Sequence, residues 1–96
     1  MIAALIDVKV DPSKVEELKK EFTALRKTVL ENEPGVLVYH LVKPRDGSDE
    51  YRFVEIYQDM DAVKVHSAAD YMRETTPKLT ACLTEAPGVK MYDVVV

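Results

Sequence analysis

Apolar residues along the chain recur at spacings that predict secondary structure. Residues 2–10 begin with apolar side chains at both parities, which predicts a strand covered on both faces. Asp11 or Ser13 then provides the N-cap of a helix over residues 12–32. Its apolar stripe has spacings of three and four and consists of Val15, Leu18, Phe22, Leu25 and Val29.

The second half of the chain predicts a hairpin, a split helix and a final strand. After Glu33-Pro34-Gly35 ends the first helix, strands over 36–43 and 50–58 flank a polar loop that contains Asp46-Gly47. A short helix capped by Asp59 or Asp61 runs to about Ser67, and another runs over 68–84. Pro77 predicts a kink or break near residues 75–76 of that helix. The last strand covers residues 89–96.

This order predicts a single α+β domain over residues 1–96 with a ferredoxin-like β-α-β-β-α-β fold. A four-stranded antiparallel sheet carries its helices on one face, and the second helix is split. Strand residues of both parities are apolar, so we expect the open face to be covered by a second subunit in a homodimer. In the strand over 36–43, one face is predicted to carry Val36, Val38 and Val42 and the other Leu37, Tyr39 and Leu41.

Composition and charge narrow the class of protein. The chain has 96 residues, of which 47% are hydrophobic and 31% charged, as in ordinary globular domains. Its formal net charge of −4 disfavours a nucleic-acid partner, and no apolar run is long enough for a membrane span. No signal peptide is apparent, and the single cysteine, Cys82, excludes a disulfide within the chain. We therefore expect a cytoplasmic protein.

Three segments together resemble the antibiotic biosynthesis monooxygenase family. They are Glu33-Pro34-Gly35-Val36-Leu37-Val38-Tyr39, then Phe53-Val54-Glu55-Ile56-Tyr57, then Asp61-Ala62 followed by His66 and Tyr71. The resemblance implies a homodimeric α/β barrel in which each subunit holds a pocket between its sheet and its helices. It also implies chemistry of the kind some members perform, the oxygenation of aromatic quinols without metal or flavin.

Positions at which the chain differs from the family pattern indicate which cofactors are not expected. The chain has no Trp, and Tyr57 stands where many relatives carry one. Haem-degrading relatives carry Trp at the position of His66 and a His at the position of Thr76, so haem degradation is not expected here. The two histidines and one cysteine show no metal-ligand spacing. We expect neither a cofactor nor a metal.

Three residues are the candidate catalytic groups. His66 falls one helical turn after Ala62, and its imidazole can take a proton from a phenol and return it. Glu55 lies in mid-strand, where it can orient His66 or bind a substrate hydroxyl, or instead pair with Arg52 or a helix group. Tyr39, like Tyr57, can donate a hydrogen bond to a developing oxyanion. Each of these residues also has a purely structural interpretation.

Four residues are the candidate substrate contacts. Strand parity places two of them on the same face as Glu55, and the other two suit a pocket wall on the second helix. In chain order they are Phe53, Tyr57, Tyr71 and Met72. The other histidine, His40, has the opposite parity to Tyr39 and is expected at the subunit interface.

These residues support three functional hypotheses. The first is a cofactor-independent monooxygenase that oxidises a small quinol or phenol with dioxygen. The second is a proton-shuttle isomerase of a small carbonyl compound, in which a phosphorylated substrate needs Lys43, Arg45 or Arg52 at the pocket. The third is a non-catalytic dimer that binds a small molecule in a pocket without titratable groups.

Overall fold

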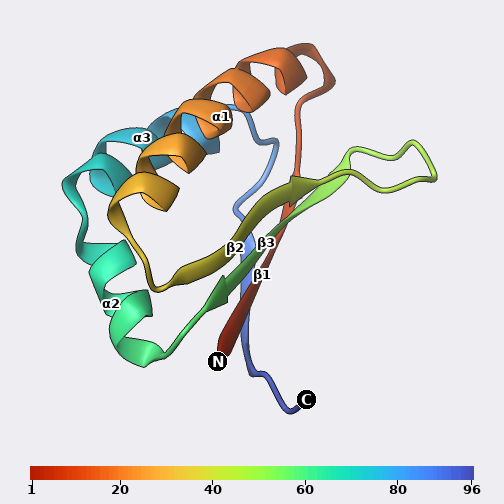
Figure 1. The fold of residues 1–96 in the computed structure, drawn as a ribbon. Helices are drawn as coiled ribbons and strands as arrows, with labels where there is room; N and C mark the ends of the chain where they lie inside the picture. The colour runs from red at the N-terminus through yellow and green to blue at the C-terminus, as the bar shows by residue number, and fades with distance from the viewer.

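The computed structural model describes residues 1–96 and has the predicted ferredoxin-like architecture (Figure 1). A four-stranded antiparallel sheet with strand order β2-β3-β1-β4 carries the helices on one face. The strands are β1 (Ile2–Lys9), β2 (Val36–Val42), β3 (Glu50–Tyr57) and β4 (Gly88–Asp93). The helices are α1 (Val15–Asn32), α2 (Met60–Ala68) and α3 (Asp70–Thr80), with a short 3-10 helix at Pro12–Lys14.

Helical structure begins at Pro12 with Asp11 as its N-cap, as predicted, but the last helix and the last strand end earlier than predicted. The first turn, Pro12–Lys14, is a 3-10 turn, and the Asp11 carboxylate accepts the backbone N–H of Ser13 at 2.9 Å. Helix α3 ends at Thr80 instead of continuing to residue 84. The last strand ends at Asp93 instead of continuing to residue 96. Register explains that end, since β4 pairs with β1 only from Gly88 to Asp93, and Asp93 lies opposite Ile2 at the start of β1.

The split in the second helical region is confirmed close to its predicted position after Ser67, but the further kink or break predicted at Pro77 was wrong. The break falls at Ala69, whose extended backbone (φ −66°, ψ 137°) separates α2 from α3. Helix α3 continues through Pro77. A proline at this position removes one hydrogen bond to the carbonyl of Arg73, which is an exposed residue, and the rest of the helix is retained.

A β-bulge in β2 changes which side chains face the helices. The register between β2 and β3 shifts between Val36 and Val38. Val36 and Tyr39 are therefore both buried, whereas Leu37 is 47% exposed. The predicted grouping of Val36 with Val38 and Val42 was wrong, because the extra residue of a bulge reverses the alternation of the strand.

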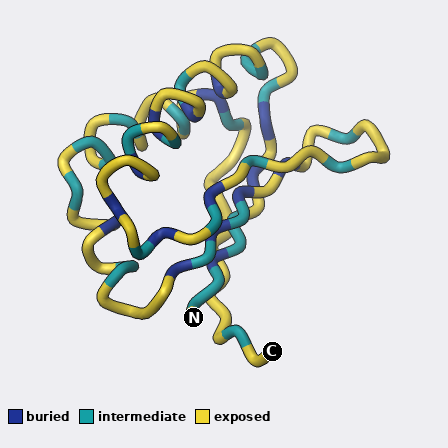
Figure 2. The backbone as a smooth tube through the Cα atoms, viewed as in Figure 1, coloured by how far each residue is buried: buried dark blue, intermediate teal, exposed yellow.

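The core lies between the helices and the sheet, where the buried positions of Figure 2 gather. Helix α1 contributes four of the five residues in its predicted stripe, namely Leu18, Phe22, Leu25 and Val29. Phe22 stacks on Tyr39 with ring centroids 5.1 Å apart and also contacts Phe53. Helix α1 thus covers β2 and part of β3, and α2 and α3 lie over the remainder of the sheet (Figure 1).

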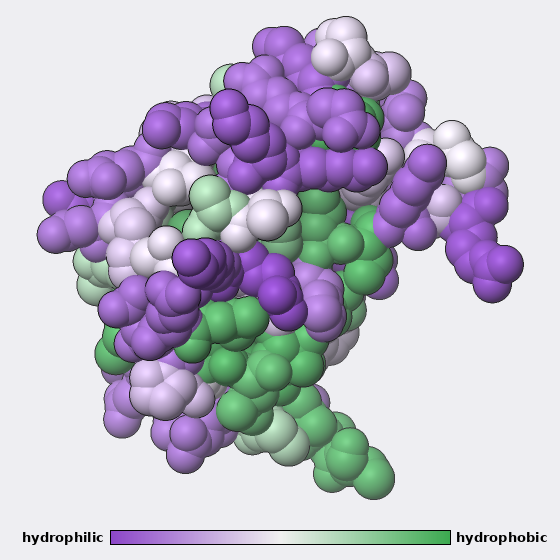
Figure 3. Space-filling model, turned by 45° about the horizontal axis from the view of Figure 1, so that its top comes forward, coloured by the Kyte–Doolittle hydropathy of each residue, from purple (hydrophilic) through white to green (hydrophobic).

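The other face of the sheet has no cover within the chain. All six residues of β4 are exposed, and Tyr92 is 41% exposed. Apolar surface gathers in the lower half of Figure 3, toward the C-terminal end, while the helical side is mainly hydrophilic. None of the helices combines the length and apolar character needed to span a bilayer.

Candidate functional site

The candidate site is built around His66, which α2 holds against the sheet. Asp59 caps this helix by accepting the backbone N–H of Ala62 at 2.9 Å. His66 follows Ala62 by one turn and is 5% exposed, so it points inward as the sequence predicts. Its ring lies between two tyrosine rings, with centroid distances of 5.3 Å to Tyr39 and 5.5 Å to Tyr57.

Glu33 holds one nitrogen of this imidazole. Its carboxylate oxygens lie 3.1 and 3.2 Å from His66 Nδ1, and Glu33 is only 4% exposed. Tyr71 donates its hydroxyl to the same carboxylate. A carboxylate beside Nδ1 favours the tautomer that carries its proton there. Nε2 is then left as the nitrogen that can accept a proton.

The Tyr39 hydroxyl lies beside the imidazole, on its Nε2 side. It is 3.5 Å from His66 Nε2 and 3.8 Å from the sulfur of Met72. Burial, followed by the nearby charge of Glu55, raises the pKa of the Tyr39 hydroxyl well above its usual range. Tyr39 therefore stays a neutral phenol, and its hydroxyl donates to the Met72 sulfur, so the lone pair of His66 Nε2 stays available.

Glu55 and Tyr57 form a second carboxylate–phenol pair near His66. The Tyr57 hydroxyl donates to Glu55 Oε1 at 2.5 Å. Burial raises the pKa of Glu55, although the hydrogen bond from Tyr57 and the proximity of His66 oppose this shift. Burial and the adjacent Glu55 also raise the pKa of Tyr57 far above its usual range. The expected alternative partner, Arg52, instead pairs with Asp7 at 2.6 Å.

His66, Glu55 and Tyr57 meet at a cavity of about 400 Å³ between α2 and α3 on one side and β1, β3 and β4 on the other. We call it the His66 cavity. Its walls are mainly apolar, with a few polar groups, which is the usual character of a small-molecule site. The lining residues are Ala4, Ile6, Glu55, Tyr57, Val63, His66, Ser67, Met72, Arg73, Thr76, Val89 and Met91.

Four of the seven predicted site residues line the His66 cavity: His66, Glu55, Tyr57 and Met72. The other three do not. Phe53 is 7% exposed and packs against Phe22 at 5.0 Å, so it belongs to the core under α1. Tyr71 is bonded to Glu33, and Tyr39, which is 2% exposed, reaches His66 from the core side.

Two residues of the site were not predicted in this role. The sequence shows Glu33 only as part of a helix end, although it belongs to the same family-like segment as Gly35. Arg73 carries no sequence signal, because an arginine on an exposed helix face is ordinary. For Glu33, the available signal was its position beside Pro34-Gly35 in that segment. The contact with His66, 33 positions later in the chain, depends on the fold.

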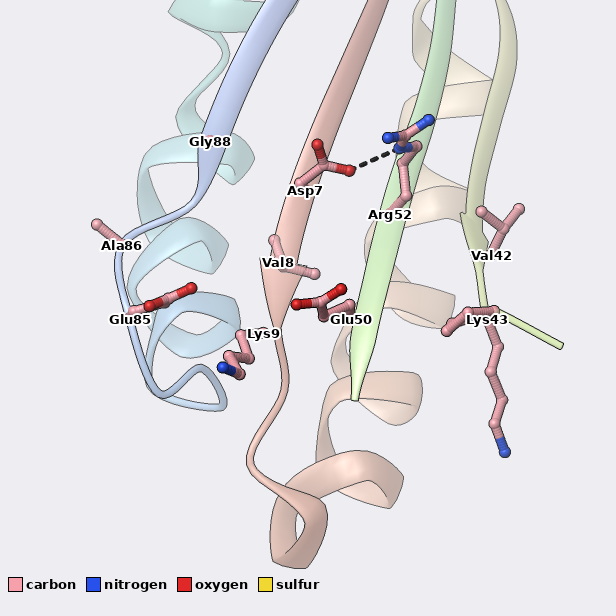
Figure 4. Close-up of a pocket in the computed structure, with 11 residues that line it drawn as sticks. Asp7, Val8, Lys9, Val42, Lys43, Glu50, Arg52, Glu85, Ala86 and Gly88 are labelled. Atoms are coloured by element: carbon pink, nitrogen blue, oxygen red, sulfur yellow. Dashed lines mark hydrogen bonds and ion pairs between the residues drawn. The ribbon is translucent and has the colours of Figure 1, made fainter. Parts of the chain in front are cut away.

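A larger cavity of about 610 Å³ lies at the open face of the sheet and is distinct from this site (Figure 4). It is lined by both cations and carboxylates, including the Asp7–Arg52 ion pair, and has no histidine. Two of the predicted phosphate-binding residues, Lys43 and Arg52, lie here, and Arg45 does not line the His66 cavity. None of the three cations named for the isomerase hypothesis therefore lines the His66 cavity.

Comparison with known proteins places the chain among similar sequences and folds. Residues 1–78 match the family described as antibiotic biosynthesis monooxygenase. A provisionally assigned antibiotic biosynthesis monooxygenase from Caulobacter crescentus CB15 is 34% identical, with a TM-score of 0.93, and the match covers 99% of this chain and 90% of that one. No curated protein matches the chain.

More distant structures share the fold. A conserved protein from Methanosarcina mazei Go1 is 23% identical with a TM-score of 0.89, over 95% of this chain and 89% of that one. Rv0793 from Mycobacterium tuberculosis is 19% identical with a TM-score of 0.86, over 99% and 95% of the two chains.

Proposed function

Because the chain belongs to the antibiotic biosynthesis monooxygenase family, we propose that it oxidises a small quinol or phenol-like aromatic compound with dioxygen and without a cofactor. Family membership supports a monooxygenase-type function, and the substrate class is our proposal. One observation carries it: a buried imidazole lines an apolar cavity while a carboxylate holds its other nitrogen. This is the arrangement of a general base.

In the proposed reaction His66 Nε2 accepts the proton of a substrate hydroxyl. The resulting phenolate is electron-rich, so its ring carbon can form a bond to dioxygen directly. One oxygen atom stays on the ring and the other leaves as water, which takes up the hydroxyl proton and the ring hydrogen. The ring supplies all four electrons, and no other reductant is required.

The other polar groups have supporting roles in this proposal. Glu33 keeps His66 in the reactive tautomer and balances the charge of the imidazolium, and Tyr71 holds Glu33 in place. Glu55 lines the cavity, where its carboxyl group can accept a hydrogen bond from a substrate hydroxyl while the Tyr57 hydroxyl donates to Oε1. Tyr39 acts through His66 because its hydroxyl does not line the cavity.

The open face of the sheet supports a homodimer as the working form. Apolar residues on this face lie opposite one another in the register, for example Leu5 with Val54 and Ala3 with Ile56. Beyond them, Asp7 lies opposite Arg52 and Lys9 opposite Glu50, so the charged part of the face carries groups of both signs. We propose that a second copy of the chain covers this face, since such a surface is self-complementary about a twofold axis.

Oxygen uptake on a panel of quinols tests the reaction. With metal-stripped protein, the wild type should consume oxygen and His66→Ala should lose about 10²-fold or more of the rate. Lys64→Ala is the matched control on the same helix, because Lys64 is exposed and does not line the His66 cavity. Uptake that survives His66→Ala removes His66 as the base, and the absence of uptake on every quinol overturns the proposed reaction.

The non-catalytic hypothesis has less support from the site. It expects a pocket without titratable groups, whereas His66 and Glu55 both line this one.

A further inference from the structure

The charged and titratable side chains that line the His66 cavity differ in how far they are buried. Glu55 and His66 are 6% and 5% exposed and form its floor. The Arg73 side chain is 75% exposed, which places it at the mouth. Between them the lining is mainly apolar. A ligand in this cavity therefore meets acceptors at one end and a cation at the other.

Nearly every hydrogen-bond donor of the cavity is already used within the protein. The Tyr57 hydroxyl donates to Glu55, the Ser67 hydroxyl to the Val63 carbonyl at 2.9 Å, and the Thr76 hydroxyl to the Met72 carbonyl at 2.6 Å. His66 Nδ1 faces Glu33. The remaining side-chain donor in the lining is the Arg73 guanidinium.

Arg73 keeps donors available for a ligand. A guanidinium has five N–H groups, and Arg73 uses Nη2 for Asp70 at 2.9 Å. Asp70 is 85% exposed and does not line the cavity. Exposed ion pairs of this kind are weak, so an anion inside the cavity competes for Arg73 on favourable terms.

We infer that the substrate is a hydroxylated aromatic carboxylic acid, bound with its hydroxyl at His66 and Glu55 and its carboxylate at Arg73. This inference rests on the proposed function for the hydroxyl end, while the carboxylate end rests on the donor arrangement alone. The planar guanidinium fork matches a carboxylate in two parallel hydrogen bonds. A phosphate dianion calls for more positive charge than one arginine provides, and Arg73 is the only Lys or Arg in the lining.

Binding of two redox-inert ligands tests the inference. 4-Hydroxybenzoate and 4-hydroxybenzamide share the ring and the hydroxyl and differ in the charge of the other substituent. By titration calorimetry the wild type should prefer the acid by about tenfold, the size of one charge-assisted hydrogen bond. Arg73→Gln should remove this preference and leave amide binding unchanged, and Arg73→Lys should restore it in part.

Lys78→Gln is the matched control, because it removes the same charge from α3 at a position outside the cavity. This variant should keep the preference for the acid. Equal binding of acid and amide by the wild type, or a preference that survives Arg73→Gln, overturns the inference.

A comparison of oxygen uptake on two substrates shows whether the ligand class or the oxidation reaction is at fault if one of them fails. 2,5-Dihydroxybenzoate and its methyl ester are compared as substrates for oxygen uptake. Preferential binding of the acid without uptake on any quinol supports the ligand class and contradicts the oxidation. Oxidation of acid and ester with equal kcat/KM supports the oxidation and contradicts the ligand class.

Discussion

Gly35 lies against Ala62 so closely that a Cβ on Gly35 would stand 2.6 Å from the Cβ of Ala62. This contact joins the start of β2 to α2. Glu33 precedes Gly35 by two residues and His66 follows Ala62 by one turn, so the two small residues allow the carboxylate and the imidazole to meet. The contact gives a physical reason for Gly and Ala at these positions of the family-like segments.

We expect Gly35→Ala to lower the free energy of unfolding by about 1–3 kcal/mol, the usual cost of overpacking. Urea denaturation followed by circular dichroism measures this change. Gly88→Ala is the control, because no atom lies within 4 Å of a Cβ placed there. A Gly35→Ala protein with the wild-type denaturation midpoint would show that α2 shifts freely away from β2.

Glu55→Gln should stabilise the protein more as the pH rises. Burial raises the pKa of Glu55 above its ordinary value of 4.5, so above that pH the unfolded chain releases this proton before the folded chain does. The wild type therefore loses stability from about pH 4.5 up to the folded pKa of Glu55, and Gln removes that loss. The difference in unfolding free energy between the two proteins, measured from pH 4 to 8, should grow with pH and then level off. A difference that shrinks with rising pH would mean that the folded state favours the ionised carboxylate.

Leu5→Lys should convert the proposed dimer to a monomer, since it puts a charge in the apolar part of the open face. Sedimentation velocity should give the wild type about twice the 10.9 kDa chain mass and the variant about the chain mass. Val65→Lys is the control, because Val65 is 61% exposed on α2, away from that face. A wild type that sediments as a monomer at micromolar concentration contradicts the proposed homodimer.

Cys82 should resist alkylation in the folded protein. It is fully buried, its sulfur contacts the Lys78 carbonyl at 3.5 Å, and burial raises the pKa of the thiol. Reaction with iodoacetamide at pH 8 should be at least about a hundredfold slower in buffer than in denaturing urea, because it requires opening of the fold. Equal rates in the two solutions would contradict the burial of this thiol.

Local patterns predicted most of the fold because they act over a few residues. The stripe of α1 and the Asp46-Gly47 hairpin were correctly located, and Gly47 has the positive φ of 80° that such a loop favours. Pro77 shows the limit of this reasoning. A proline predicts a break in isolation, but the chain parts at Ala69, where α2 closes with the Ala69 N–H on the His66 carbonyl.

Strand parity predicted which face Phe53, Glu55 and Tyr57 share, but not what covers each of them. Helix α1 brings Phe22 onto Phe53, whereas Glu55 and Tyr57 lie under the gap that becomes the His66 cavity. The distinction between a core residue and a cavity residue thus depends on where helices pack. That placement is set by contacts between segments far apart in the chain.

The sequence alone determined the ferredoxin-like order of elements, the inward position of His66 and the shared face of Glu55 and Tyr57, because periodicity encodes these features locally. The tertiary structure decided the partners. It placed Glu33 on His66 Nδ1, Tyr71 on Glu33 and Arg73 at the cavity mouth. Such pairings form only when the fold brings distant segments together and burial makes a hydrogen-bond partner obligatory.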